Sequence, residues 1–498
     1  MTNAIVIGSG FGGLTSAMLL QANGIQTTLI ESLPVVGGRG RVFAYNDYEF
    51  EGGPTVITAP SVIEEVYTKS GLKFSSEVTL LETTPFYDLY FSDGSKMSYY
   101  GDQDKLLEQI RQINPDDVSG YLKFYKKSQQ IYNKGFVELV RQPFLSNMDF
   151  LKQLPNLAIL GAYKSVYRMI KKYFKDDRLR RAFSFHTLLI GGNPVTTTSI
   201  YTLIHALERS EGVYYVQGGT HKLAENMTEN FTKLGGKVRL NSNVKSIIVE
   251  NQQTKGVSLE NGEKILADII VSNADVTRTY TKFLDNSVKK DYDQKWFDKK
   301  QYTPGLFITY FVTNKEYPDL AHHSIVFCER YEKLLEDIFE PNNILTEDFS
   351  LYVHAAKRTD PTRAPEGKEM FYVLSVVPNL KSDVDWDSVK EQYQDKILKE
   401  LDNRVLPGLM DNLDFATSFT PKDFETVLQS EYGAFASLQP RLFQSGPFRP
   451  HNKSHKIEGL YFAGAGTQPG AGVPGVIPSG IITCDLIFKD LGIKPKYW

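Results

Sequence analysis

The chain of 498 residues is 41% hydrophobic and 23% charged, which are ordinary values for a globular protein and indicate no disorder. Its length exceeds what one simple core supports and predicts two or three domains. A formal net charge of −3 gives no basis for nucleic-acid binding, and two distant cysteines exclude a cysteine-based zinc cluster and give no basis for a disulfide framework.

The first predicted element is a strand, turn and helix that binds a dinucleotide. Residues 4–7 form an apolar run typical of a buried parallel strand, and a helical pattern opens after the glycine turn that follows. Gly8 permits the tight turn, and Gly10 lets the backbone approach a pyrophosphate. Gly13 allows the helix to pack closely on the strand, while free N–H groups at the helix start favour negative charge.

A second strand, expected over residues 26–30, ends in Glu31. A carboxylate at this point accepts hydrogen bonds from a ribose hydroxyl and argues against the 2′-phosphate of NADP. Two further glycine-rich clusters follow at residues 37–41 and 52–55. An NAD domain has no need of them, whereas a flavin whose pyrophosphate and ring system lie along the chain does. The sequence therefore predicts a site for FAD.

The segment after these clusters mixes helices and strands. We expect a helix over residues 61–70, strands between residues 78 and 100, and a helix that starts near residue 103. That helix should break at Pro115 and resume over residues 118–132.

Residues 122–181 concentrate positive charge in a chain that is nearly neutral overall. Within this segment, apolar residues fall at helical spacing and basic residues occupy the other faces; the apolar ones are Val166, Met169, Ile170 and Tyr173. Such a helix either packs its apolar stripe on the core or lies in a membrane interface with its lysines against anionic head groups.

Two histidines, His186 and His205, follow in apolar helical surroundings. A histidine in this context is expected to be a packing residue with a satisfied ring. The two have no metal-ligand spacing between them, so we predict no metal site.

Residues 212–275 should complete the dinucleotide domain. They contain a strand over residues 238–250, a hairpin turn at Asn261-Gly262 and a further strand that ends near Asn273. A second inserted region follows, in which residues 306–312 and 371–377 read as strands that are apolar or aromatic on both faces. Buried strands of this kind suit the floor of an apolar cavity.

The end of the chain, like its start, is predicted to contact a ligand. A strand over residues 459–463 leads into a loop of glycine and proline over residues 464–475, and a helix follows. Such a loop lets the backbone come close to a ligand, because a solvent-exposed linker would carry more Ser, Lys and Glu.

The predicted fold is therefore α/β, with a Rossmann-type FAD-binding domain that is discontinuous over residues 1–80, 211–280 and 440–498. An α+β substrate domain is expected over residues 81–120 and 281–439, and a helical, basic-apolar region over residues 121–210. Neither a secretion signal nor an apolar run of about 18 residues is visible in the sequence. We therefore expect a peripheral location on the cytoplasmic side of the cell membrane.

The sequence resembles the bacterial-type phytoene desaturases among the FAD-dependent carotenoid desaturases. The resemblance extends along the whole chain and rests on the motifs at residues 8–13, 37–39, 53–57, 183–194, 199–209, 272–275, 320–323, 364–367, 449–451 and 462–475. Where the family carries Thr-His-Pro-Gly, this chain has Gln468 in place of the histidine, which excludes histidine chemistry there. The resemblance implies a monoamine-oxidase-like fold, attachment to a membrane surface, and stepwise insertion of double bonds into phytoene to give lycopene or a less desaturated product.

The site residues that we expect lie mainly at the two ends of the chain. The cofactor-binding residues are Gly8, Gly10, Gly12, Gly13, Glu31, Gly38, Arg39, Arg41, Gly53, Pro54, Thr55, Val244, Gly464, Gly466, Gly472 and Val473. Asp149 is the candidate catalytic residue, as a lone carboxylate in the basic-apolar segment. The alternative is that Asp149 is a surface charge next to Lys152.

The chemistry expected of such a protein needs few catalytic side chains. A long hydrocarbon offers no polar handle, so its binding rests on an apolar tunnel, at about 0.8 kcal/mol for each buried CH₂. Removal of hydride to the flavin leaves a delocalised cation that loses a proton readily, so position and cofactor matter more than a strong base. The terminal electron acceptor is expected to be oxygen or a quinone.

Several other functions stay open on the sequence alone. Within the same group these are a diapophytoene desaturase for thirty-carbon substrates, a carotenoid isomerase and a desaturase of hydroxylated carotenoids. A soluble flavin amine oxidase would not need the basic apolar surface. A non-enzymatic prenyl-lipid carrier would share the fold, but GDP-dissociation inhibitors, which are such carriers, have lost a usable flavin site.

Overall fold

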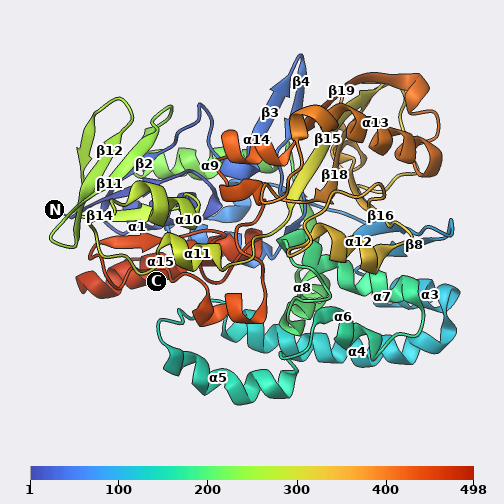
Figure 1. The fold of residues 1–498 in the computed structure, drawn as a ribbon, viewed down its shortest axis with the longest axis horizontal. Helices are drawn as coiled ribbons and strands as arrows, with labels where there is room; N and C mark the ends of the chain where they lie inside the picture. The colour runs from blue at the N-terminus through green and yellow to red at the C-terminus, as the bar shows by residue number, and fades with distance from the viewer. Residues whose placement is uncertain (1) are drawn as a thin grey trace.

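A parallel five-stranded sheet forms the base of the fold. The computed structural model describes residues 2–498, except for the side chains of Asn147, Asp149 and Phe150. The sheet has the strand order β10-β2-β1-β14-β20. Its strands are β1 (Asn3–Ile7), β2 (Gln26–Ile30), β10 (Lys237–Arg239), β14 (Ile269–Ser272) and β20 (Leu460–Phe462). The start, middle and end of the chain therefore meet in one sheet, as Figure 1 shows.

Three helices pack beside this sheet: α1 (Phe11–Ala22), α9 (Thr220–Lys233) and α15 (Val473–Leu491). Helix α1 packs against both of the others. A Cβ atom at Gly13 would lie 2.1 Å from the carbonyl oxygen of Gly8, and one at Gly480 would lie 2.7 Å from that of Gly12. These contacts leave no room for a side chain, which confirms the predicted close packing of the first helix on the first strand.

A seven-stranded sheet stands beside the first and has the order β19-β15-β18-β17-β16-β7-β8. Its strands are β7 (Tyr87–Tyr90), β8 (Lys96–Tyr99), β15 (Gly305–Thr313), β16 (His323–Val326), β17 (Leu351–His354), β18 (Glu369–Val377) and β19 (Leu413–Phe419). Strand β15 is buried along its whole length, as expected for a strand that is apolar on both faces. Helix α13 (Trp386–Arg404) packs aromatic side chains against Phe307 of β15 and against Phe349, which precedes β17.

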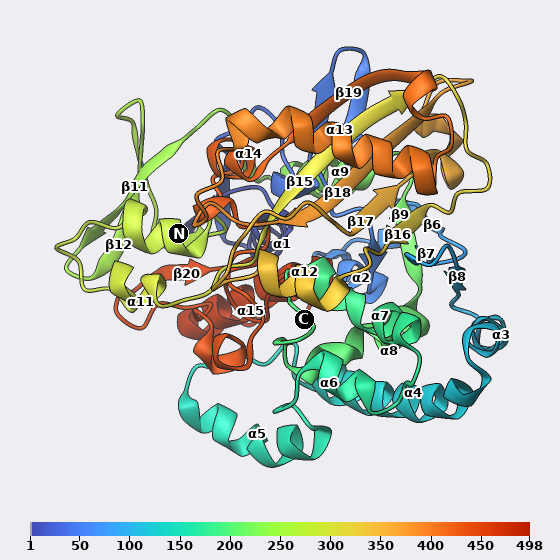
Figure 2. The ribbon, with the colours of Figure 1, turned by 45° about the vertical axis from the view of Figure 1, so that its right-hand side comes forward.

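Five helices gather at the lower edge of Figures 1 and 2. They are α4 (Val118–Tyr132), α5 (Asn147–Leu160), α6 (Val166–Lys171), α7 (Asp177–Ser184) and α8 (Leu203–Glu211). Helix α3 (Gln103–Ile113) ends just before Pro115, and α4 begins at Val118, so the predicted break is confirmed. Proline fixes its own backbone and disfavours helix at the residue before it.

Shorter elements complete the fold. The other strands are β3 (Val42–Tyr45), β4 (Tyr48–Glu51), β5 (Ile57–Thr58), β6 (Leu80–Glu82), β9 (Val213–Val216), β11 (Val244–Glu250), β12 (Gln253–Leu259) and β13 (Lys264–Leu266). The other helices are α2 (Pro60–Thr68), α10 (Val276–Arg278), α11 (Gln294–Asp298), α12 (Tyr331–Ile338) and α14 (Pro421–Thr426). Strands β12 and β13 pair antiparallel across the turn at Asn261-Gly262, as the sequence predicts.

The amphipathic segment around residue 166 does not face outward. Val166 is 1% exposed and Ile170 is fully buried, and both belong to the largest core cluster. The expectation that this apolar stripe could lie in a membrane is therefore wrong, because the stripe fills the space between α4, α7 and α12. Instead, exposed apolar side chains lie on and next to α5; they are Met148, Leu151, Leu154, Ile159 and Tyr163. Among the described residues, no helix combines the length and the apolar character that crossing a membrane requires.

Candidate cofactor and substrate site

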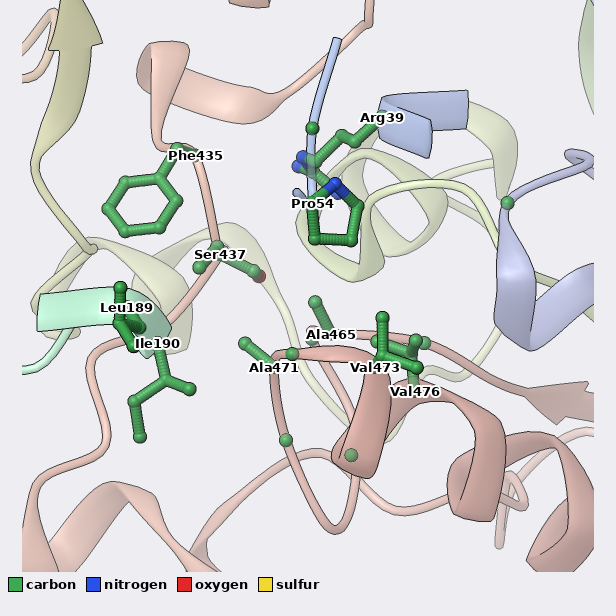
Figure 3. Close-up of a pocket in the computed structure, with 18 of the residues that line it drawn as sticks. Arg39, Pro54, Leu189, Ile190, Phe435, Ser437, Ala465, Ala471, Val473 and Val476 are labelled. Atoms are coloured by element: carbon green, nitrogen blue, oxygen red, sulfur yellow. The ribbon is translucent and has the colours of Figure 1, made fainter. Parts of the chain in front are cut away.

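One large cavity is lined by residues of both sheets and of the helical region. Its volume is about 600 Å³, within the usual range for ligand sites. The lining begins at the glycine turn before α1 and reaches Leu157 on α5. Figure 3 shows Arg39 and Pro54 facing Ala465, Val473 and Val476 at one end of this space. The two ends of the chain therefore form one binding surface.

Two helix N-termini face the polar end of the cavity. Helix α1 starts after Gly10 and α15 starts after Gly472, and both glycines line the cavity. A glycine has no side chain that could cap the first N–H groups, so these donors are left for a ligand. Each helix start also carries partial positive charge, and together they suit a pyrophosphate.

Glu31 is fixed in place at the end of β2. Its Oε2 accepts hydrogen bonds from the backbone N–H of Ser9 at 2.9 Å and from the Ser9 hydroxyl at 2.6 Å. Its Oε1 accepts from the N–H of Leu33 at 3.0 Å. The carboxylate is buried, lines the cavity and keeps lone pairs free, since each oxygen can accept more than one bond. It is therefore able to hold a ribose hydroxyl.

Two arginines carry buried donors without a partner among the described residues; Arg39 lines the cavity, and Arg41 does not. Arg39 donates from Nη2 to the Ser430 hydroxyl at 2.6 Å, while its buried Nε has no hydrogen-bond partner within the described part of the chain. Burial lowers the pKa of Arg39, and the nearby Asp275 carboxylate opposes this change. Arg41 likewise has Nε and Nη1 buried without a partner among the described residues. Buried donors left unpaired are costly, so this observation fits an anionic or carbonyl-bearing cofactor such as FAD.

Most of the predicted cofactor residues meet in the cavity. Those that line it are Gly8, Gly10, Gly12, Glu31, Gly38, Arg39, Gly53, Pro54, Thr55, Val244, Gly464, Gly466, Gly472 and Val473. Gly13 packs under the turn, and the Arg41 guanidinium lies 5.0 Å from the centre of the Phe43 ring. Asp149 belongs to α5, and its side chain lies outside the described residues.

The other end of the cavity is apolar. Its lining includes Leu188, Leu189, Ile190, Leu203, Ile204, Leu334, Leu335, Ile338 and Phe435. Leu189, Ile190 and Phe435 lie across from the cofactor end in Figure 3. The seven-stranded sheet adds Leu306, Leu374 and Val376. A wall of this kind binds hydrocarbon by excluding water from it, without a polar group to fix its position.

Sequence reasoning missed a buried carboxylate in the apolar half. Glu208 on α8 is fully buried and lines the cavity, and Nε2 of His186 lies 3.1 Å from its Oε2. His186 was expected to be a packing residue only. The available signal was the helical spacing, because Glu208 lies four residues after Ile204 and so shares its apolar face.

A group of three buried histidines lies close to the cavity wall. Their candidate ligand atoms are within 4.8 Å of one another; the residues are His322, His323 and His354. Nδ1 of His323 is 2.8 Å from the hydroxyl of Tyr352, which lines the cavity. Burial is the main cause that lowers the pKa of each ring well below its usual value. The sequence analysis predicted no metal site and did not consider this group.

Comparison with known proteins agrees with this architecture. Residues 11–488 match the family described as flavin containing amine oxidoreductase. Among solved structures, putrescine oxidase bound to putrescine superposes with a TM-score of 0.63 at 15% identity, over 98% of this chain and 99% of that one. At this identity the similarity establishes the fold alone.

Curated relatives are closer in sequence. The chain is 43% identical to the lycopene-forming phytoene desaturase of Pantoea ananas, over 99% of this chain and 100% of the relative. It is 42% identical to the neurosporene-forming phytoene desaturase of Rhodobacter capsulatus, over 98% and 94%. A 4,4'-diapophytoene desaturase of Methylomonas sp is 31% identical, over 99% and 96%. The chain therefore belongs to the flavin containing amine oxidoreductases and, within them, to the bacterial phytoene desaturase family.

Proposed function

We propose that the protein inserts double bonds into phytoene, a linear forty-carbon hydrocarbon, and forms lycopene or a less desaturated product. The observation that carries the proposal is the continuity of the cavity, which joins a dinucleotide site at Gly10 to an apolar chamber at Leu188. Bound FAD supplies the acceptor for a hydride. The chain itself positions the hydrocarbon and keeps water away from the reacting carbons.

FAD is the cofactor, as in the flavin containing amine oxidoreductases generally. We assign its pyrophosphate to the starts of α1 and α15, its ribose to Glu31, and its adenosine end to Val244, which lines the cavity near Glu31. Arg39 and Arg41 supply the unpaired donors. Gly53, Pro54 and Thr55, together with the loop at residues 464–475, close around the flavin end.

The forty-carbon substrate is favoured over a thirty-carbon one by the comparisons. Phytoene desaturases that form lycopene or neurosporene are 40–43% identical, whereas the relative named for diapophytoene is 31% identical and a zeta-carotene-forming phytoene desaturase is 30% identical. Lycopene-forming relatives are 42–43% identical and neurosporene-forming relatives are 40–42% identical, so the proposal includes both products. A carotenoid isomerase remains an alternative in the same group. The prenyl-lipid carrier is disfavoured by the unpaired arginine donors beside an open cofactor site.

We also propose that α5 attaches the protein to a membrane surface. Ile159 is 77% exposed and Tyr163 is 68% exposed, next to basic residues such as Lys152. On its other side the same helix contributes Leu157 to the cavity lining. A phytoene molecule is dissolved in the bilayer, so this arrangement would let it pass directly from lipid into the apolar chamber.

Expression in a host that makes phytoene tests the proposal. Pigment extraction should yield lycopene or a partly desaturated carotene, and the purified protein should be yellow and release FAD. Unchanged phytoene with a FAD-loaded protein would refute the substrate assignment. A geometric isomer of a supplied carotene, with no loss of hydrogen, would support the isomerase instead. A protein that stays colourless when FAD is added would support the carrier.

A further inference from the structure

We infer that Glu208 is the counter-charge and proton acceptor for a positive charge that forms on the hydrocarbon in the apolar half of the cavity. The inference rests on the proposed desaturation and adds to it a residue with a defined task. It also predicts a further ligand class for the site: long hydrocarbon chains that carry a positive charge.

The position of Glu208 separates it from the other acids of the cavity. Among the described lining residues, the acidic ones are Glu31, Glu208 and Asp275. Glu31 is held by Ser9 at the ribose end, and Asp275 caps α10 beside Arg39. Glu208 instead lies on the same helix as the apolar lining residues Leu203, Ile204 and Leu207. It is the acid that a hydrocarbon would meet.

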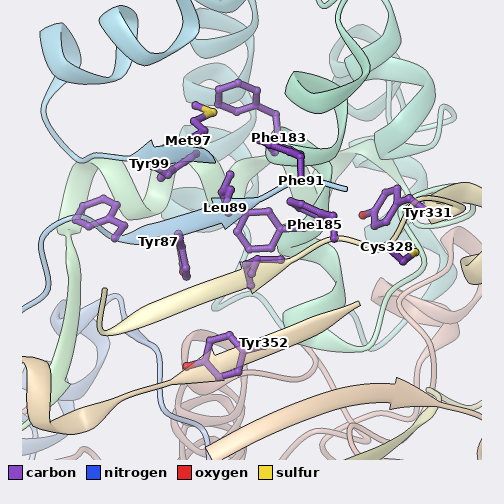
Figure 4. Close-up of a cluster of buried hydrophobic side chains, with 14 of the residues drawn as sticks. Tyr87, Leu89, Phe91, Met97, Tyr99, Phe183, Phe185, Cys328, Tyr331 and Tyr352 are labelled. Carbon is purple, nitrogen blue, oxygen red and sulfur yellow. The ribbon is translucent and has the colours of Figure 1, made fainter. Parts of the chain in front are cut away.

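Two groups from different elements lie at the carboxylate: Tyr87 donates a hydrogen bond to it, whereas Oε2 of Glu208 and Nε2 of His186 make no hydrogen bond among the described residues. The Tyr87 hydroxyl on β7 donates to Oε1 at 2.8 Å, and Nε2 of His186 is 3.1 Å from Oε2. Figure 4 shows Tyr87, Tyr99 and Phe185 close together in this cluster. Burial, and next the charge of Glu208, raises the pKa of Tyr87 well above its usual value. Tyr87 therefore stays a phenol and a hydrogen-bond donor.

Neither His205 nor Arg209 supplies a positive charge to the Glu208 carboxylate. Burial lowers the pKa of His205 well below its usual value, with smaller contributions from His186 and Arg209, so His205 is neutral near pH 7. Arg209 points away from the cavity, to the carbonyl of Tyr100 and to Gln103. A buried carboxylate is costly unless it is paired. A positive charge on a bound hydrocarbon would be stabilised here far more than in water, because the surroundings are apolar.

The step balances in atoms and electrons. One carbon of the chain loses hydrogen together with its bonding pair, as a hydride for the flavin, and an allylic cation remains on the hydrocarbon. The C–H bond of the neighbouring carbon then breaks, and its electron pair becomes the new C=C bond. The proton goes to Oε2 of Glu208, which becomes a neutral carboxylic acid that the Tyr87 hydroxyl and the His186 ring still contact.

Packing alone could also explain a Glu208–His186 pair, and a binding experiment separates the two explanations. The probes are a twenty-carbon isoprenoid chain ending in a dimethylamine, which is protonated at pH 7, and the same chain with carbon in place of nitrogen. Binding is measured by the change in the flavin absorption spectrum, without turnover. The wild-type protein should prefer the amine by at least about tenfold, which corresponds to about 1.4 kcal/mol. Glu208→Gln should reduce the preference to about twofold while it keeps the affinity for the neutral chain.

Two further variants act as controls. His186→Gln keeps the carboxylate and should keep the preference for the amine, whereas a purely structural pair would respond in the same way to both changes. Glu211 lies on the same helix and accepts a hydrogen bond from the Tyr132 hydroxyl. The variant Glu211→Gln should therefore bind both probes as the wild type does. In a single turnover with phytoene, flavin reduction should slow by about 10²-fold in Glu208→Gln, because the amide no longer stabilises the cation that loss of hydride leaves, and it should stay unchanged in Glu211→Gln.

The outcomes distinguish this inference from the proposed function. A wild-type protein that desaturates phytoene but shows no preference for the amine would overturn the role of Glu208 and leave the function intact. A Glu208→Gln variant that still prefers the amine would likewise overturn the role of Glu208 and leave the function intact. A wild-type protein that binds FAD and produces no desaturated carotene would overturn the proposed function itself.

Discussion

The hydroxyl of Tyr352 lies 2.5 Å from Oγ1 of Thr55, and this contact joins the seven-stranded sheet to the loop at the flavin end of the cavity. Tyr352 also contacts Nδ1 of His323 at 2.8 Å, so its hydroxyl lies between two partners. Both Tyr352 and Thr55 line the cavity. This buried contact therefore helps to fix the position of the cofactor loop relative to the substrate wall.

A double-mutant cycle on this contact should give a coupling energy of about 1 kcal/mol, measured by chemical unfolding of Thr55→Val, Tyr352→Phe and the double variant. Thr55→Val removes one of the two partners of the Tyr352 hydroxyl, Tyr352→Phe removes this partner from the Thr55 hydroxyl, and the double variant removes both hydroxyls. The control is the same cycle with Thr55→Val and Tyr393→Phe, because the Tyr393 hydroxyl contacts Ser375 and not Thr55. This control cycle should give no coupling energy. Additive effects for the Thr55–Tyr352 pair would mean that the contact is not formed in solution.

Arg41→Met should weaken FAD binding by about tenfold and leave the stability of the cofactor-free protein nearly unchanged. The reason is that Nε and Nη1 of Arg41 have no partner among the described residues, so a ligand has to supply one. FAD affinity is measured by fluorescence titration, and stability by thermal unfolding without FAD. Arg239→Met is the matched control, because Arg239 pairs with Glu263 on the surface and should leave FAD affinity as it is. Equal FAD affinity in wild type and Arg41→Met would exclude Arg41 from the site.

The sequence predicted those parts of the fold in which local pattern and tertiary packing agree. Gly13 is required both by the turn and by contact with Gly8, so the motif identifies the strand and helix together. The helix at Val166 was ambiguous, because helical spacing reveals an apolar face without showing what covers it.

The partners of Glu208 could not be predicted for a different reason. His186 and Tyr87 come from separate elements and meet Glu208 only in the folded chain. A single acid on an apolar face is a weak signal without these neighbours. The glycine turn at the start and the loop at the end were predicted to contact a ligand, and in the structure they line one cavity.

Replacing Leu151 and Ile159 with Glu should abolish sedimentation of the protein with anionic liposomes. Both side chains are more than half exposed on α5, and a charge there opposes burial in the acyl region. FAD content should not change, because neither residue lines the cavity. The control is Leu266→Glu, which alters a leucine that is 69% exposed on β13, away from α5. Unchanged sedimentation of the α5 variant would show that this helix is not the membrane contact.

The stability of the protein should fall as the pH drops from about 6.5 toward 5, because of the buried histidines. His322, His323 and His354 have pKa values well below those of the unfolded chain, chiefly through burial. In this range the unfolded chain binds protons that the native protein does not, so acidification favours unfolding. Above about pH 6.5 the rings are neutral in both states, and they cause no further change.

Several titratable or charged groups surround the histidines. They are Tyr87, Tyr215, Tyr352, Tyr372 and Arg363. The tyrosines keep their protons in this range, since burial raises the pKa of each, and Arg363 adds to the lowering of the pKa of His354. Burial raises the pKa of Glu51, so protonation of Glu51 works in the opposite direction at lower pH. His354→Gln should therefore have a lower free energy of unfolding at pH 7.5 but a smaller loss between pH 6.5 and 5. Exposed His455→Gln should keep the wild-type slope, and an equal slope in His354→Gln would rule out this cluster as its source.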